Sequence, residues 1–90
     1  MIVELTPSLY KVAKLIPSGM SNKDIAAHTN LSPQVVKNYL VVIMDKCGAD
    51  NRTILAVLLT SGAVVIKERE PKNNDAKQSN MSQLQTAQAS

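Results

Sequence analysis

The sequence has few aromatic residues and little cysteine, and each shortage limits what the protein can be. It contains no Phe and no Trp, and its aromatic residues are Tyr10 and Tyr39, so a buried core has to be built from Val, Ile, Leu, Met and Ala. Cys47 is the one cysteine. A single cysteine excludes an intrachain disulfide and favours a reducing compartment.

Long hydrophobic runs are also missing. The longest apolar tract, residues 54–66, is interrupted by Thr60, Ser61 and Gly62 and is too short to span a bilayer. Residues 1–20 lack the unbroken apolar segment of a secretory signal peptide. We therefore expect a soluble, cytoplasmic protein without a membrane partner.

Patterns typical of catalysis or metal binding are absent from the sequence. The single histidine, His28, has no second His, no nearby Cys and no acidic cluster at the spacing of metal ligands, so a surface position is expected. No nucleophile–base pair, carboxylate pair or glycine-rich phosphate loop is present. We predict a protein that is not an enzyme and needs no metal or cofactor, with Cys47 as a buried core thiol.

Charge and composition change along the chain. Ten Lys and Arg against seven Asp and Glu give a formal charge of +3, a weak indication of an anionic partner because the basic residues are spread out. From residue 71 onward the chain is rich in Gln, Asn and Ser and too poor in apolar residues to offset the entropy of ordering. The sequence predicts one domain over residues 1–67 and a disordered tail over 68–90.

Capping residues and apolar spacing predict four helices. Thr6, followed by a proline, is expected to start the first helix, with Leu5 and Tyr10 packed together across that start. Pro17 lacks an N–H, so this helix should stop or kink near Ile16.

The second and third helices are predicted to follow each other almost directly. Ser21 caps the second helix, and Asn30 can adopt the left-handed conformation that ends it. Ser32 caps a third helix that runs to about Lys46 or Cys47. Two helices joined by so short a turn describe a helix-turn-helix, and in DNA-binding versions the second of the pair lies in the major groove.

Apolar spacing sets the orientation of the third helix. The predicted core face contains Val36, Leu40, Ile43 and Cys47, and the predicted outer surface contains Gln34, Lys37, Asn38 and Val41. Lys37 can donate to guanine or to a phosphate, Asn38 can pair with adenine, and Val41 can contact a thymine methyl group. The N–H groups at the starts of the second and third helices can also hold phosphate oxygens. An ordinary solvated helix surface is the alternative interpretation.

A fourth helix is expected to begin near Arg52, capped by Asp50 or Asn51, and to end near Gly62. Its apolar residues form two adjacent stripes, Ile54, Leu58 and Val65 in one and Leu55, Leu59 and Ile66 in the other. One stripe is enough to cover a small core, and the second has no evident partner within the chain. Residues 63–66 remain open as a helix extension or a strand.

The runs GMSNKDIA, LSPQVVKN and KCGADNRT together resemble the LuxR-type helix-turn-helix family, the output domain of LuxR and FixJ, in register and without gaps. The resemblance covers roughly residues 5–59. It implies an all-α, four-helix domain that binds double-stranded DNA as a homodimer and regulates transcription. Residues 33–46 would be the recognition helix, and the fourth helix would carry the dimer contact.

The resemblance also implies a set of contact residues. The DNA-binding set is Ser21, Asn22, Lys23, Ser32, Gln34, Lys37, Asn38, Val41, Lys46 and Arg52. Of these, Lys46 and Arg52 occupy basic positions that are either phosphate-directed or structural. The dimer set is Ile54, Leu55, Leu58 and Leu59, whose division between core and interface stays open.

The chain departs from the family pattern on the groove-facing side of the third helix. Val41 and Val42 stand at positions that are often polar or basic in the family, and Leu9 stands where a glutamate is usual. Family members also usually follow a sensor domain, so this chain is either a small stand-alone member or part of a longer regulator. These features favour an alternative function, a protein-binding antagonist or co-regulator that pairs with a full-length LuxR-type regulator.

Overall fold

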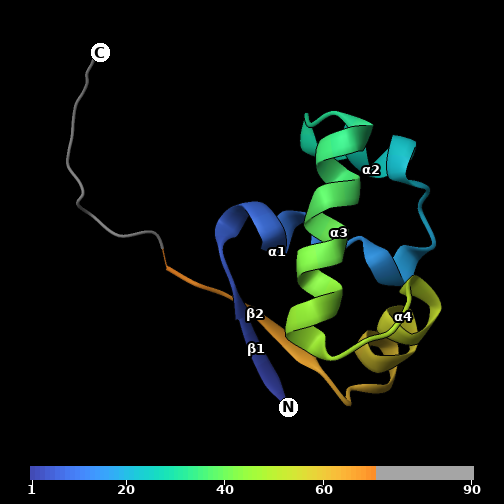
Figure 1. Cartoon of the computed structure of the whole chain (residues 1–90). Helices are drawn as coiled ribbons and strands as arrows, with labels where there is room; N and C mark the ends of the chain where they lie inside the picture. The colour runs from blue at the N-terminus through green and yellow to red at the C-terminus, as the bar shows by residue number, and fades with distance from the viewer. Residues whose placement is uncertain (71–90) are drawn as a thin grey trace.

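The computed structural model describes residues 1–70 of the chain (Figure 1). In chain order the elements are β1 (Ile2–Leu5), α1 (Pro7–Ala13), the 3₁₀ helix η1 (Ile16–Ser18), α2 (Asn22–Thr29), α3 (Pro33–Cys47), α4 (Arg52–Ser61) and β2 (Val65–Glu68). The four predicted α-helices are present. None of the helices in residues 1–70 is both long enough and apolar enough to cross a membrane.

Each α-helix begins at a polar side chain that accepts a hydrogen bond from the first turn. Ser21 Oγ accepts from the Asp24 N–H at 3.1 Å, and Ser32 Oγ accepts from the Val35 N–H at 3.2 Å. Asn51 Oδ1 accepts from the Ile54 N–H at 2.9 Å. Thr6 caps α1 in the same way. These caps satisfy N–H groups that have no partner inside a helix, and they confirm the predicted starts.

Three of the α-helices, α2, α3 and α4, end where the backbone turns left-handed. Asn30 has φ 61° and closes α2, while Gly48 at φ 69° closes α3 and Gly62 at φ 82° closes α4. A backbone φ near +60° is strained for most residues, but asparagine and glycine tolerate it. The turn between α2 and α3 is therefore only a few residues long, as predicted.

The first helix ends earlier than expected. It was predicted to reach Ile16, but it stops at Ala13, and the chain continues as the short 3₁₀ helix η1 around Pro17. Proline has no N–H for an α-helical hydrogen bond and its ring crowds the preceding turn. The disturbance therefore shortens the helix rather than kinking it.

The two strands are the main difference from an all-α domain. They form a parallel sheet in which Ile2 pairs with Val65 and Leu5 with Glu68. Of residues 63–66, which were left open, Val65 and Ile66 are β-branched and lie in β2, whereas Ala63 and Val64 form the bend that follows Gly62. The strand β2 runs one residue past the predicted boundary at 67, and the predicted tail from residue 71 lies outside the described residues.

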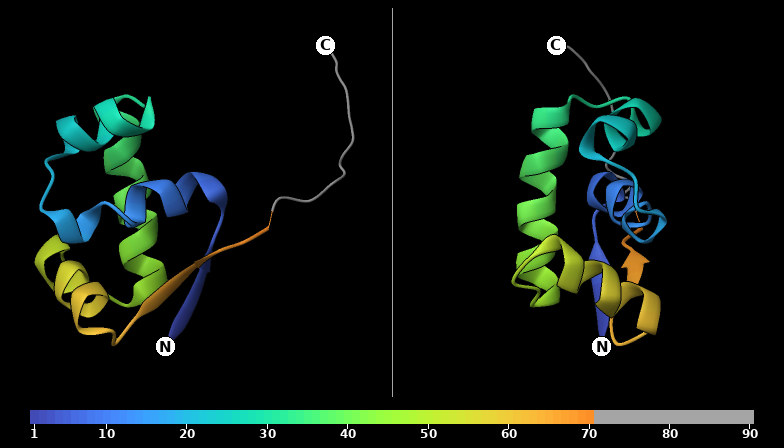
Figure 2. Two further views of the ribbon diagram at one scale, coloured as in Figure 1. Left: turned by 180° about the vertical axis from the view of Figure 1, so that it is seen from behind. Right: turned by 90° about the vertical axis from the view of Figure 1, so that its right-hand side faces the viewer.

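The core lies between α3 and the other elements. Its largest fully buried side chains are Leu5, Val12, Ile16, Ile25, Val36, Ile43 and Leu55. In the right-hand view of Figure 2, α3 runs along one side of the domain with the remaining helices packed behind it. One long side of α3 is therefore left without any covering element.

Candidate nucleic-acid interface

The uncovered side of α3 carries the residues predicted to read DNA. Val36, Leu40, Ile43 and Cys47 are buried on the inner side. Gln34, Lys37, Asn38 and Val41 are all exposed on the outer side. The predicted division of this helix into an inner and an outer face is therefore confirmed.

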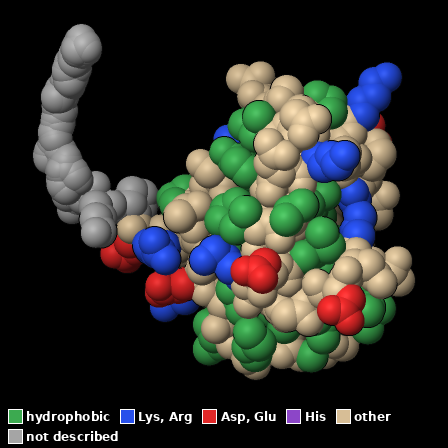
Figure 3. Space-filling view, viewed as in Figure 1, with side chains coloured by type: hydrophobic (Ala, Val, Ile, Leu, Met, Phe, Trp, Pro, Cys, Tyr) green, Lys and Arg blue, Asp and Glu red, His purple; other side chains and the backbone are tan. Residues whose placement is uncertain are grey.

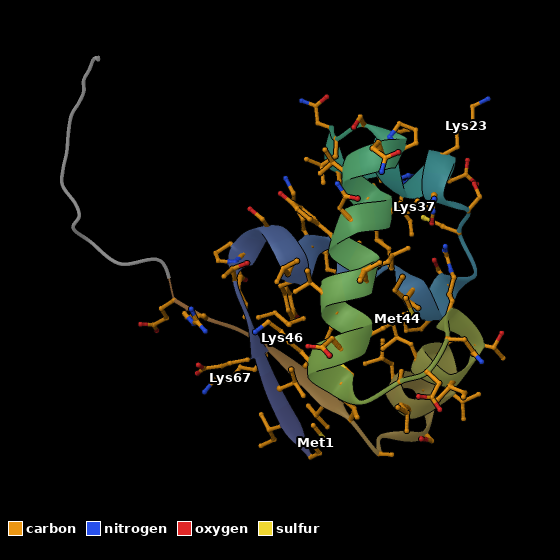
Figure 4. All side chains as sticks on the ribbon, in the orientation of Figure 1. Met1, Lys23, Lys37, Met44, Lys46 and Lys67 are labelled. Carbon is orange, nitrogen blue, oxygen red and sulfur yellow. The ribbon has the colours of Figure 1, made fainter. Side chains whose placement is uncertain are left out.

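Lys37 and Lys46 lie on opposite flanks of α3. They are nine positions apart, and because each helical residue turns the chain by about 100° this separation amounts to half a turn around the axis. Figure 4 shows the two lysines on opposite sides of the helix, with Met44 on the same side as Lys37. Two cations in this arrangement can each contact one of the two phosphate backbones on either side of a groove, rather than the same strand.

The outer face changes in chemistry along its length. Gln34 and Asn38 lie at its start, Val41 and Val42 follow in the middle, and Asp45 lies near its end, all exposed. A carboxylate repels phosphate, so the outer face around Asp45 is poorly suited to enter a groove, whereas Lys46 lies on the flank of the helix. The N-terminal half of the helix is the part that matches a groove.

Gln34 and Asn38 are linked to each other. Gln34 Nε2 donates to Asn38 Oδ1 at 3.1 Å, one helical turn away. The second lone pair of that oxygen and both N–H donors of Asn38 stay available for a base edge. The contact therefore orients the Asn38 amide while leaving its capacity for a bidentate pair with adenine intact.

The start of α2 brings a second polar group toward the same end of the molecule. Ser21 and Lys23 are exposed there, and Figure 4 shows Lys23 at the upper right, on the same side of α3 as Lys37. The Ser21 hydroxyl accepts from Asp24 N–H, and the Ser32 hydroxyl accepts from Val35 N–H. Each hydroxyl proton remains free to donate to a phosphate oxygen.

Arg52 has intramolecular partners. From the start of α4 its half-buried guanidinium donates to the side-chain oxygen of Asn22 and to the main-chain carbonyl of Met20. Both acceptors belong to the entrance of α2. Arg52 was expected to be either phosphate-directed or structural, and these hydrogen bonds favour the structural role. They also occupy Asn22 Oδ1, which is then not free to accept a hydrogen bond from DNA. Because Arg52 and Asn22 are thirty residues apart in the chain, no local sequence pattern predicts their contact.

Replacing Arg52 with lysine is expected to lower the free energy of unfolding by about 1–3 kcal/mol. Lysine keeps the positive charge but cannot place two N–H donors in the planar fork that reaches Asn22 and Met20 together. Urea denaturation followed by circular dichroism measures the loss. The change Lys46→Arg, at an exposed position whose side chain has no hydrogen bond or ion pair within residues 1–70, is the matched control and should stay within about 0.5 kcal/mol. An Arg52→Lys chain as stable as its parent would contradict the structural role.

The two apolar stripes of α4 have different environments. Leu55 is 0% exposed and Leu59 half-buried, so this stripe belongs to the core. Ile54 and Leu58 belong to the outer stripe together with Val57, which is 57% exposed. Leu55, predicted for the dimer interface, is thus enclosed by its own chain. Val57 was not in that predicted set, although its position three residues after Ile54 is the helical signal that finds it.

The remaining reactive side chains lie away from this face. Cys47 is buried, and burial raises the pKa of its thiol above the ordinary value, because a thiolate would lose its hydration there. His28 is exposed, with Nδ1 at 3.1 Å from the Asp24 carbonyl oxygen. Within residues 1–70, no three His, Cys, Asp or Glu side chains are grouped closely enough to hold a metal ion.

Two hollows in residues 1–70 lie away from the outer face of α3. One, of about 290 Å³, is lined by Tyr10, Lys14, Pro17, Leu59, Val64, Val65 and Ile66. The other, of about 310 Å³, is lined by Lys11, Lys14, Leu15, His28 and Thr29. The candidate site is therefore a convex helix surface rather than a cavity.

Comparison with known proteins agrees with this arrangement. A protein of Mycobacterium tuberculosis, named as the HTH-type transcriptional regulator Rv0890c, is 39% identical over 51 residues, a match that covers 57% of this chain and 6% of that protein. No solved structure shows a significant match. Residues 4–59 match the bacterial regulatory proteins of the luxR family, also called GerE. This family consists of non-enzymatic DNA-binding proteins. The chain therefore belongs to the luxR family and contains its helix-turn-helix DNA-binding domain.

Proposed function

We propose that the protein is a sequence-specific transcription regulator that inserts the N-terminal half of α3 into the major groove of DNA. The observation that carries the proposal is the uncovered side of α3, where Gln34, Lys37 and Asn38 are exposed at the end that is free of acidic residues. An α-helix fits the major groove, whose base edges present a distinct pattern for every base pair. The recognition helix would comprise residues 33–46.

Base reading would depend on three side chains in this half of the helix. Asn38 can donate to N7 of an adenine and accept from its N6 amino group, and Lys37 can donate to O6 and N7 of a guanine. Val41, which is 58% exposed, can contact a thymine methyl group. Together these contacts would favour a short sequence of mixed composition.

Phosphate contacts would position the helix without reading sequence. Ser21 and Lys23 at the start of α2 and Ser32 at the start of α3 can contact one strand, where main-chain N–H groups add partial positive charge. Lys46 can contact the opposite strand from the other flank of α3. Asn22 and Arg52 would act indirectly, by holding the start of α2 in place.

The exposed stripe of α4 supports a homodimer. Ile54 and Val57, 39% and 57% exposed, follow each other at helical spacing on the outside of this helix, and the half-buried Leu58 beside them packs partly against the core. Two copies paired along this stripe would present two α3 helices to half-sites related by two-fold symmetry. Dimerisation also doubles the number of phosphate contacts and hence the dependence of binding on salt.

Replacing Lys37 with alanine is expected to weaken binding to the preferred duplex by about 1–3 kcal/mol. The loss should be larger for the preferred sequence than for random DNA if Lys37 reads a base, and equal for both if it contacts a phosphate. Fluorescence anisotropy at several salt concentrations, with a duplex identified by selection from a random pool, measures both effects. The change Lys14→Ala removes the same charge from the residue that follows α1, away from the outer face of α3, and should have little effect. A salt slope near zero for the parent chain would contradict DNA binding itself.

The valines of α3 favour a second candidate function. Val41 and Val42 are 58% and 41% exposed in the middle of the outer face, and Figure 3 shows apolar side chains gathered over this part of the helix. Such a surface also suits a co-regulator or antagonist that binds a full-length member of the same family. Mixing the chain with a luxR-family regulator in a mass measurement tests this idea. Strong sequence-specific binding to DNA by the purified chain, with no mixed complex, would exclude it.

A further inference from the structure

The N-terminal strand exposes apolar side chains where a soluble domain usually places polar ones. Ile2 is 72% exposed, and Val65, its partner across the sheet, is 51% exposed. Side chains of paired residues point to the same face, so the two form one apolar patch on the outer face of the sheet. The next pair on that face is Glu4 with Lys67, and Glu4 also lies 3.8 Å from Arg69. The apolar patch therefore occupies one end of the sheet and the charged pairs occupy the other.

This apolar end is attached directly to the end of α4. The amino group of Met1 donates to the Ala63 carbonyl at 3.1 Å, and Val64 N–H donates to the Leu58 carbonyl at 3.0 Å. Figures 1 and 4 place Met1 and the turn after α4 at the same lower end of the molecule. Figure 3 shows apolar side chains gathered along this end. The C-terminal end of α4 and the patch on the sheet thus adjoin each other.

The area that α4 can offer alone is small for a dimer. Its ten residues make a helix about 15 Å long, and a contact strip roughly 10 Å wide covers on the order of 150–300 Å² per protomer. Specific interfaces bury about 600–1,000 Å² per partner. A dimer built on α4 therefore gains area if a neighbouring apolar surface joins the contact. The patch of Met1, Ile2 and Val65 adjoins the C-terminal end of α4.

We propose that the dimer interface extends from α4 onto the apolar end of the β1–β2 sheet, so that Ile2 and Val65 contact a second copy of this chain. The inference rests on the proposed homodimer and specifies which further surface the second copy covers. Edge strands normally carry charged residues that prevent pairing with other chains. The charged end of this sheet, with Glu4 and Lys67, would mark the rim of the interface.

The test is the dimer dissociation constant of Ile2→Glu and Val65→Glu chains, measured by sedimentation equilibrium with and without a duplex that carries two half-sites. Both changes are expected to raise this constant at least tenfold, because each places a charge in an apolar contact. Ser8→Glu adds the same charge to an exposed residue of α1 that belongs to no proposed contact surface, and it should leave the dimer dissociation constant unchanged. Thermal melting shows whether each glutamate variant is folded. If one is not, the milder Ile2→Ser change takes its place in the measurement of the dimer dissociation constant.

The outcomes separate this inference from the proposal on which it rests. If the Ile2 and Val65 variants dimerise within about twofold of the parent while a charge on α4 makes the chain monomeric, the interface is α4 alone and the extension is wrong. If the parent chain stays monomeric both alone and on the two-site duplex, the homodimer itself is excluded.

Discussion

A Val57→Glu chain is expected to remain folded but monomeric, and to bind a duplex with two half-sites about 100-fold or more weakly than its parent. Val57 is the most exposed apolar residue of α4, so a glutamate there disturbs little of the core. In a dimer the same carboxylate would be forced out of water beside its own copy across the two-fold axis. Once the dimer is lost, each half-site is bound separately, and the gain from linking two binding events, on the order of 10²–10⁴, disappears.

Sedimentation equilibrium and anisotropy on the same samples measure the two effects. Ser8→Glu is the control, since it adds the same charge to an exposed residue of α1, outside α4, and it should still dimerise. A duplex with a single half-site should bind the parent and the Val57→Glu chain with similar affinity. A variant that keeps the parent's mass and its affinity for two half-sites would show that α4 is not the dimer contact.

Truncating Leu55 to alanine is expected to lower the free energy of unfolding by about 2–5 kcal/mol. Leu55 is fully enclosed, so the change removes buried methyl groups and leaves a cavity that the neighbouring side chains fill only in part. A small domain has only about 5–15 kcal/mol of stability in total. The loss is therefore a large share of that total, and a substantial unfolded population is expected at 37 °C.

Urea denaturation at two protein concentrations distinguishes a core residue from an interface residue. A core role predicts the same loss at both concentrations, whereas a dimer role predicts a loss that grows as the protein is concentrated. Ile54→Ala, on the outer stripe of the same helix, provides the comparison and should cost less than about 1.5 kcal/mol in dilute solution. If Ile54→Ala is the more damaging of the two in dilute solution, the assignment of the stripes is reversed.

The helix boundaries of this domain can be predicted from the sequence because local contacts determine them. Ser21, Ser32 and Asn51 each bond to an N–H three residues ahead, and Asn30 ends α2 through its own backbone conformation. The exposed face of α3 follows from the same periodicity, since burying Val36 and its partners leaves the other side outward. The candidate DNA-reading residues could therefore be named in advance.

What the sequence could not predict depends on contacts between distant residues. The strand β1 has only four residues, and its partner lies at the other end of the described chain. The bonds from Arg52 to Asn22 and Met20 likewise join separate helices. Leu55 and Ile54 belong to stripes of equal apolarity, so spacing alone cannot tell which one the core encloses. Only the packing of α4 against the rest of the chain decides between them.

The parallel sheet has a consequence for how the protein is made. Its strands join the first residues of the domain to the last, as the bond between Met1 and Ala63, 62 positions apart, illustrates. During translation β1 leaves the ribosome first and must wait, unpaired, until β2 has emerged. The helices can form locally within that time, but closing a loop of this length carries an entropic cost that only the completed chain can offset. Final closure of the domain is thus expected to be a late step, taken after nearly every helical residue has been synthesised.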